Sequence, residues 1–385
     1  MLCSTIEINK KQTQPNNMSN PESRIFREME ENTRRENEQK AQLFERAAAH
    51  NTPTLEDFRT DENSRQINSD ERYVERTKER FSNEENSYHA KAFEHIFQLN
   101  VAQGRWLNNP EDDSYRAEAI PVTEYDDFRN RIDIASTVHI PGEHSDSGED
   151  EEYTFGIDLT TSADEATIRK KILYASNDPD FDGPVGFSQL RYYRNHAGQI
   201  GKKPLIPRYC IGVNRDSVDD VLTNTNIQNG HIRSRKPDYL QQFKVLHEMA
   251  VQNELFEGPL YTKEDDGTIS EEEEQALRGI EQLDRVYLDE RERIAKLLPK
   301  WTTEGAIDKN GNFNLDRIAQ NIITNDEDRT FATILSVTER LSLDAFADPD
   351  QLKIEARRYG RRQSGETDRN LGHSAIRNIH TEEAN

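Results

Sequence analysis

FRNRIDIASTVHI, residues 128–140, and YTFGIDLTTS, residues 153–162, are the two stretches that decide the fold of this chain. Both are rich in Ile, Val, Thr and aromatic residues, which is typical of β-strands. The segment between them, residues 141–152, contains six carboxylates and no Lys or Arg. The two stretches therefore predict a hairpin with a long acidic tip.

Each stretch carries one carboxylate at a position where an interior strand would carry an apolar residue. Asp133 lies between Ile132 and Ile134, and Asp158 directly precedes Leu159. Two interpretations of Asp158 stay open: it caps the strand end by bonding to a turn, or it is held at the rim of a sheet to bind a metal. If the strands pair, the two carboxylates approach one another and repel unless a proton or a cation neutralises them. Mg²⁺ or Mn²⁺, which take oxygen ligands, are the cations that we expect.

Helices are predicted on both sides of the hairpin. The second begins at a capping box formed by Ser162 and Glu165. The first runs from about Asp70 to Val101 and places Glu94 inside the apolar stripe of its second half, formed by Ala90, Phe93, Phe97 and Val101.

Lys171 stands out on the second helix. It lies three residues from Ile168 on an apolar stripe that also contains Ile172 and Ala175. Lys170 points about 100° away from it, toward solvent. A Lys on an apolar face is unfavourable unless its amine reaches water or a partner. We therefore expect Lys171 to point toward the sheet.

The remaining pattern predicts an α/β core followed by helices. Two more strands are predicted at 186–194 and 206–214, and helices at 238–256, 271–298, 314–323 and 327–341. These elements predict four regions: a polar, partly helical or disordered extension (1–69), the α/β core (70–225), a helical region (236–343) and a polar tail (344–385).

The composition limits the class of protein. Of 385 residues, 33% are hydrophobic and 32% are charged, against averages of about 45–50% and about 25%. Part of the chain is therefore expected to be solvated helix or disordered. The net charge of -23 argues against attraction of the whole surface to nucleic acid or to anionic membranes, although it leaves room for a local basic groove.

The expected cellular compartment follows from three features that the sequence lacks: a disulfide framework, a transmembrane segment and a signal peptide. The two cysteines, Cys3 and Cys210, give no disulfide framework or zinc site, so a reducing compartment is expected. No stretch approaches the roughly 18 consecutive apolar residues of a transmembrane helix. The first residues lack the apolar run of a signal peptide. We expect a cytoplasmic protein with no membrane partner.

Residues 186–215 reverse the sign of the overall charge. This segment has no Asp or Glu, and its basic residues are Arg191, Arg194, Lys202, Lys203, Arg208 and Arg215. The tyrosines interleaved with them, Tyr192, Tyr193 and Tyr209, are typical of sites where bases stack. The segment favours a nucleic-acid partner. The alternative is that it neutralises the acidic hairpin tip of the same chain.

NRIDIAS and GIDLT, set between two helices and followed by a strand, resemble the core of the PD-(D/E)XK nuclease superfamily, which has a restriction-endonuclease-like fold. RID stands where that family has its first Asp, and GIDLT stands where it has (D/E)-x-K. The stretches YDDFRNRIDI, FGIDLTTS and IPRYCIGV are also similar to a group of bacterial proteins with this core. The resemblance covers about residues 85–215, and its motif is short.

The resemblance implies a site as well as a fold. Asp133 and Asp158 would hold a divalent metal, and Glu94 would be the first-helix carboxylate that completes the metal shell. Thr160 stands at the position of the family Lys and carries no charge. Some members of the superfamily place that Lys on the following helix, as Lys171 would be here. The implied activity is metal-dependent hydrolysis of phosphodiester bonds in nucleic acid, in which the metal activates water and Lys171 stabilises developing charge.

A second function class fits the same residues. The two aspartates are also explained as strand-end or turn carboxylates, and Glu94 and Lys171 as side chains that reach water or pair with each other. In that case the chain is a catalytically inactive scaffold that uses its polar helices to bind a protein partner. The two classes differ in whether Asp133, Asp158 and Lys171 converge.

Overall fold

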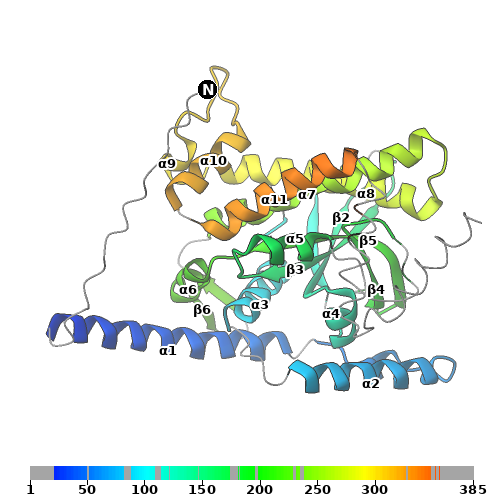
Figure 1. Ribbon diagram of the computed structural model, residues 1–385, viewed down its shortest axis with the longest axis horizontal. Coiled ribbons are helices and arrows are strands. Elements are labelled where there is room, and N and C mark those ends of the chain that lie inside the picture. Colours follow the sequence, from blue (N-terminus) through cyan, green and yellow to red (C-terminus); the bar gives the residue numbers. More distant parts are fainter. Residues whose placement is uncertain are drawn as a thin grey trace, which may run out of the picture.

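The computed structural model describes residues 21–49, 52–81, 88–108, 114–120, 122–145, 147–173, 181, 183–195, 198–228, 231–234, 238–326, 328–347, 352 and 355. Within these residues the protein has a mixed α/β fold, in which helices surround a five-stranded mixed sheet (Figure 1).

The sheet has the order β1-β2-β3-β5-β4. Its strands are β1 (Arg116–Ile120), β2 (Ile134–Ile140), β3 (Glu151–Thr160), β4 (Phe187–Arg194) and β5 (Ile200–Gly212). The predicted hairpin is confirmed, because β2 pairs with β3 in antiparallel register with Ile134 opposite Ile157. The pair β3 and β5 is parallel, and the crossover between them contains a helix, α5 (Glu165–Leu173).

The predicted start of the first hairpin strand is wrong. A helix, α4 (Glu124–Asn130), occupies the residues before the strand, and Thr123 caps it by accepting the backbone N–H of Asp126. Arg131 ends α4 in the left-handed conformation, with φ of 56°. Asp133 therefore lies in the bend between α4 and β2 rather than within a strand. Strand β1 was also absent from the sequence prediction.

Two predicted features of the helices are corrected as well. The single helix expected from Asp70 to Val101 is instead α2 (Ser64–Phe81) and α3 (Tyr88–Ala102). Residues 82–87 and Ala175 lie outside the described residues. Helix α5 is capped by Asp164, whose carboxylate accepts the N–H of Thr167 at 2.8 Å, and not by Ser162.

The other helices lie around the sheet. They are α1 (Pro21–Ala49), α6 (Arg215–Asn224), α7 (Tyr239–Asp265), α8 (Glu271–Ala295), α9 (Lys300–Thr303), α10 (Leu315–Asp326) and α11 (Arg329–Ala347), with a short 3₁₀ helix η1 (Leu55–Phe58) and a small hairpin of β6 (Thr225–Gln228) and β7 (His231–Ser234). Figure 1 shows α7, α8 and α11 on one side of the sheet and α1 and α2 on the other.

The two faces of the sheet pack against different partners. On one face, the rings of Phe155 and Tyr209 lie 5.8 Å apart, and Tyr287 of α8 lies 6.3 Å from Phe155. The opposite face has a smaller apolar cluster of Ile120, Ile132, Ala135, Leu190, Tyr193 and Ile206. Because side chains alternate along β3, Asp158 points to this second face.

One hydrophobic core joins the regions that the sequence separates. The largest buried cluster includes residues from Ala41 of α1 to Leu352 near the end of the chain. Helix α1, which is polar by composition, is docked on α6: Asn37 hydrogen-bonds the carboxylate of Asp219 at 3.0 Å, and Lys40 donates to the carbonyl of Leu222 at 2.8 Å.

Candidate active site

Asp158 is the centre of the candidate site, and it is 4% exposed. The Lys171 amine donates to one of its carboxylate oxygens and, at 2.7 Å, to the carbonyl of Leu159. The guanidinium of Arg208 donates to the other oxygen at 3.0 Å. Among the described residues, the partners of the Asp158 carboxylate are therefore two cations and not a turn. One cation comes from α5 and the other from β5.

Arg208 also bonds to the backbone of α5. Its side chain is fully buried. Its second terminal nitrogen donates to the carbonyl of Lys171 at 2.6 Å and to that of Ile172 at 3.4 Å. These carbonyls belong to the last turn of α5, where backbone acceptors have no partner within the helix. Arg208 thus ties β5, β3 and the end of α5 together.

Asp133 is fixed beside Asp158 by backbone contacts. Its carboxylate accepts the N–H of Leu159 at 2.7 Å, and its own N–H donates to the carbonyl of Ile157 at 2.8 Å. Burial raises the pKa of the Asp133 carboxyl, and the charge of Asp158 raises it further. Lys171 opposes this effect. Asp133 is thus held against the backbone of Leu159, the residue that follows Asp158.

Glu94 and Asp133 line the same cavity, whose volume is about 260 Å³. Both carboxylate oxygens of Glu94 accept from Lys91, at 2.9 Å each. Burial raises the pKa of Glu94 to about 7; Lys91 opposes the shift, whereas Asp133 adds to it. The structure therefore brings Glu94 close to Asp133, but pairs it with Lys91 rather than with Lys171.

Asp127 is a member of this cluster that sequence reasoning missed. It lines the same cavity, and burial, followed by the charge of Asp133, raises its pKa well above the ordinary value. The signal that would have revealed it is the cap Thr123. Once 124–130 is assigned as a helix, successive residues point about 100° apart. Asp126 then faces the core, where it accepts the N–H of Arg191 at 2.8 Å, and Asp127 faces the cavity.

The carboxylates suit a divalent metal only in a limited way. Within the described part of the chain, no three His, Cys, Asp or Glu side chains are grouped so that they would hold a metal ion. Mg²⁺ in proteins commonly takes one or two carboxylates and completes its shell with water and substrate phosphate. Asp133 and Asp158 offer such a pair, and no described residue hydrogen-bonds the second oxygen of Asp133. Both oxygens of Asp158, by contrast, already accept from Lys171 and Arg208.

Three arginines of the basic segment 186–215 bond to other groups of the chain. Arg208 is buried, so its position gives no support to a contact with nucleic acid. The guanidinium of Arg191 donates to the hydroxyl of Tyr125 at 2.6 Å. That of Arg194 donates to the carbonyl of Asp57 at 2.8 Å. Among the described residues of the segment, Lys202 is exposed and Lys203 half-buried.

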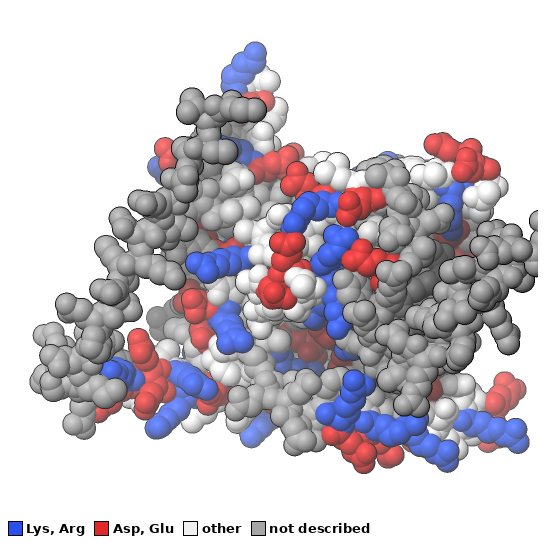
Figure 2. All heavy atoms as spheres, viewed as in Figure 1, with Lys and Arg blue, Asp and Glu red and all other residues white. Residues whose placement is uncertain are grey.

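The tyrosines of the segment do not form a stacking surface. Tyr192, Tyr193 and Tyr209 are 6%, 8% and 0% exposed, so the expectation that they stack on bases is wrong. On the face shown in Figure 2, basic and acidic side chains are interspersed. Lys202 and Arg215 are the exposed basic residues of the described segment, and Lys203, Arg191 and Arg194 are half-buried.

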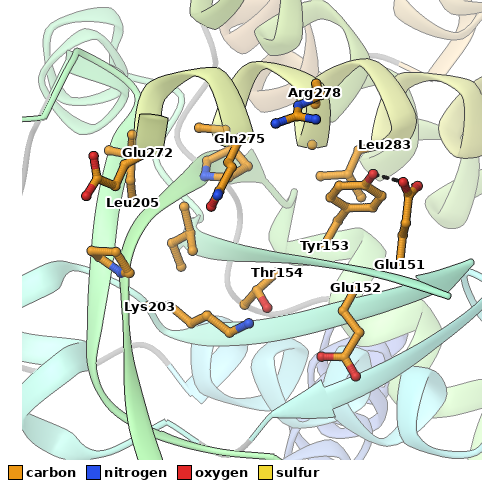
Figure 3. A pocket seen from close by; sticks show the side chains of 15 residues that line it. Glu151, Glu152, Tyr153, Thr154, Lys203, Leu205, Glu272, Gln275, Arg278 and Leu283 are labelled. Atoms are coloured by element: carbon orange, nitrogen blue, oxygen red, sulfur yellow. Dashed lines mark hydrogen bonds between the residues drawn. The ribbon is translucent and has the colours of Figure 1, made fainter. Parts of the chain in front are cut away.

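A second cavity, of about 370 Å³, lies where β3 and β5 separate (Figure 3). The two strands pair only from Gly156 and Arg208 onward, so their earlier residues diverge beneath α8. Lys203 and Glu152 line this cavity, and Arg278 and Glu272 reach it from α8. Because Lys203 shares the cavity with carboxylates of the acidic hairpin, self-neutralisation remains a valid account of this part of the basic segment.

Comparison with protein-family models, curated proteins and solved structures finds no match to this chain. The helices within the described residues include none that is both long and apolar enough to cross a membrane. Function is therefore inferred from the geometry of the site itself.

Proposed function

We propose that this chain is a metal-dependent, nuclease-like protein that hydrolyses phosphodiester bonds in nucleic acid. The observation that carries the proposal is the convergence of Asp133, Asp158 and Lys171 from three separate elements: the α4–β2 bend, β3 and α5. Burial and the charge of Asp158 raise the pKa of Asp133, and a buried carboxyl with a raised pKa beside another charged group is typical of catalytic sites.

The order of the elements supports the same proposal. Along the chain, α3 is followed by β1, α4, the antiparallel hairpin of β2 and β3, α5, β4 and the strand β5, which is parallel to β3. Helix, hairpin, helix and strand occur in this series in the order that the resemblance to the PD-(D/E)XK superfamily implies, with β1, α4 and β4 in addition. Thr160 occupies the position of the family Lys. Lys171 supplies an amine to Asp158 from the next helix instead, as we expect for a displaced lysine.

Asp133 and Asp158 would hold the divalent ion, which supplies an activated water and neutralises the phosphate. Lys171 acts as a charged donor. Burial lowers its pKa, but Asp158 and Asp133 outweigh this effect and raise the pKa above its ordinary value. A protonated amine beside the reacting phosphate stabilises the negative charge that develops in the transition state. Arg208 neutralises the second oxygen of Asp158 and keeps that carboxylate in place.

The test is cleavage of single- and double-stranded DNA and RNA with Mn²⁺ or Mg²⁺. Lys171→Met should lower the rate by about 100- to 1,000-fold, because such electrostatic groups have effects of that size. Lys170→Met is the matched control, since Lys170 is next in the helix and makes no hydrogen bond to Asp158. Equal rates for the two variants would exclude Lys171 as the displaced family lysine.

A catalytically inactive scaffold is the second candidate. The observation that favours it is that both oxygens of Asp158 are already bonded to cations of the chain. In that case Lys171 and Arg208 replace a metal, and the exposed faces of polar helices such as α1 bind a protein partner. Calorimetry separates the two: absence of Mg²⁺ and Mn²⁺ binding, together with absence of cleavage of all substrates, supports the scaffold.

A further inference from the structure

Helix α2 carries a row of arginines on the side that points away from the protein. Its inner side is marked by Ile67 and Val74, which are 0% and 7% exposed. Successive residues of a helix point about 100° apart, so Arg65, Arg72 and Arg76 lie on the opposite side. All three are exposed. We call them the arginine face of α2; Figure 2 shows Lys and Arg side chains along this helix, at the lower right of the view.

The arginine face has no carboxylate partner within the described part of the chain. Arg76 donates from its Nε to the backbone carbonyl of Arg72 at 3.0 Å, which leaves its charge without a counterion. Lys78 of the same helix, by contrast, pairs with Glu124 at 2.6 Å. The chain has 73 Asp and Glu against 50 Lys and Arg. Carboxylates are therefore abundant, and a shortage of them does not explain the unpaired arginines.

The fold gains no stability from this arrangement. Arg72 and Arg76 are four residues apart, and like charges at this spacing on a helix repel one another and destabilise it. Because the side chains point into solvent, they cover no part of the core. A residue pattern that breaks a local rule without benefit to the fold is typical of a functional surface. The missing counterion is then expected to come from a partner.

The chemistry of the arginine face favours a phosphate backbone. A guanidinium group binds two oxygens of a phosphate at once. Arg65 and Arg76 are separated by a helix length of about 16 Å, and duplex DNA carries one charge about every 1.7 Å of its axis. A duplex that lies along α2 therefore offers phosphates to every arginine of the face. An anionic membrane fits less well, because helices that lie on membranes insert apolar side chains, and none of the exposed large apolar residues of the described chain lies on α2.

We propose that the arginine face of α2 is a contact surface for the phosphate backbone of nucleic acid. The choice of nucleic acid among polyanions rests on the proposed function. The face itself is separate from the Asp133 site: the inner side of α2 contacts α4, where the Tyr73 hydroxyl donates to the carbonyl of Phe128 at 3.4 Å, and the arginines point the other way. The surface holds a long polymer and takes no part in hydrolysis.

The test is fluorescence anisotropy of the full chain with a labelled duplex of about 30 base pairs, in EDTA, between about 50 and 200 mM NaCl. Arg65→Gln, Arg72→Gln and Arg76→Gln are combined in one variant, because Gln has a helix propensity similar to that of Arg. Binding at the lower salt concentration should weaken at least about 10-fold. The slope of log affinity against log salt should become shallower by about two to three, which is about one for each lost phosphate contact.

The matched control combines Lys296→Gln, Lys300→Gln and Lys309→Gln. These lysines are also exposed, and they lie on or beside α8 and α9 rather than on α2. The control loses the same amount of positive charge as the arginine variant, so it separates an effect of the arginine face from an effect of net charge. It should keep the wild-type slope. Circular dichroism of both variants establishes that they are folded.

Three results would overturn the inference: no duplex binding by the wild type, equal slopes for wild type and the arginine variant, or equal weakening in the two variants. Binding to phosphatidylserine vesicles that depends on the arginines, with unchanged duplex binding, identifies a membrane surface and also refutes the proposal. Cleavage of DNA by a wild type whose affinity is independent of the arginines refutes the surface and leaves the proposed function standing. Binding as expected by a wild type that cleaves no substrate supports the surface and removes the proposed hydrolysis.

Discussion

At the scale of single residues, the role that the sequence predicts for Arg208 differs from the one that the structure shows. In the sequence it belongs to a basic segment that favours phosphate contacts, whereas in the structure it is buried and bonded to Asp158 and to two carbonyls of α5. Breaking a buried ion pair by removing one partner leaves an uncompensated charge, which is far more costly than losing a surface contact. Arg208 therefore stabilises the fold, and it can affect activity only by holding the Asp158 carboxylate in place.

Arg208→Met should lower the free energy of unfolding by about 3–5 kcal/mol, because it leaves the buried Asp158 with Lys171 alone. Urea denaturation measures this change. Lys202→Met is the matched control; Lys202 is an exposed cation of the same strand, and its loss should stay within about 0.5 kcal/mol. A loss below about 1 kcal/mol for Arg208→Met would mean that the guanidinium does not stabilise the end of α5.

At the scale of elements, local capping signals were informative but not sufficient. The sequence pattern S-x-x-E occurs before both α5 and α8. In α8, Ser270 accepts the N–H of Glu273 at 3.2 Å, and Glu273 accepts the N–H of Ser270 at 3.1 Å, so this box is formed. Before α5 the same pattern fails, because Asp164 is closer to the first turn and caps the helix there.

Ser270→Ala should therefore lower the free energy of unfolding by about 1 kcal/mol, as expected for the loss of an N-cap. The same substitution at Ser162 should change it by a few tenths at most, because Ser162 lies before the cap of α5. Chemical denaturation of the two variants gives the comparison. Similar losses for both would show that Ser162 supports the start of α5 in a way that its contacts do not reveal.

At the scale of the whole molecule, α7 is the helix around which the core is built, and it buries polar groups on most sides. Lys244 pairs with Asp326 and Asp328, and Glu248 accepts the N–H of Gly212 at 3.1 Å. The ring of His247 stacks on Phe243 and lies 3.2 Å from a terminal nitrogen of Arg291. Burial, and then the charge of Arg291, lowers the pKa of His247 to about 3.

This shift predicts a pH dependence of stability. His247 stays neutral in the folded state, whereas in the unfolded state it takes up a proton below about pH 6.5. Its stabilising effect is therefore present above pH 6.5 and is lost as the pH falls toward 3. Between pH 7 and pH 5 this contribution falls by about 2 kcal/mol. The loss begins at the unfolded pKa of about 6.5, so it extends over about one and a half pH units at about 1.36 kcal/mol per unit.

Urea denaturation at both pH values should show a smaller loss of stability for His247→Gln than for wild type, by about the same 2 kcal/mol. Because the two proteins share all other titrating groups, their difference isolates His247. Parallel losses in both proteins would show that the imidazole is protonated within the fold.

The sequence by itself determined the local parts of this protein. Alternation and β-branched residues specified the β2–β3 hairpin, and periodic apolar residues specified α7, α8 and α11, because these patterns depend only on which side of an element faces the core. They also marked Asp133, Asp158 and Lys171 as carboxylates and a cation in apolar surroundings. The contact of Lys171 with Asp158 follows from the short connection between β3 and α5, and that of Asp133 with the N–H of Leu159 from the hairpin.

Only the tertiary structure decided which partners these groups take. Arg208 reaches Asp158 because β5 lies beside β3, a neighbour 50 residues away along the chain. Asp127, Glu94 and His95 meet because α4 and α3 lie around one cavity, although nothing in their local sequences relates them. The attraction between charges depends on their distance in space and not on their separation in the sequence. Arg208, which the sequence predicts as a surface cation, is therefore buried beside Asp158. The physical reason is that burial, which sets both the pKa and the partner of a polar group, is a property of the packed molecule.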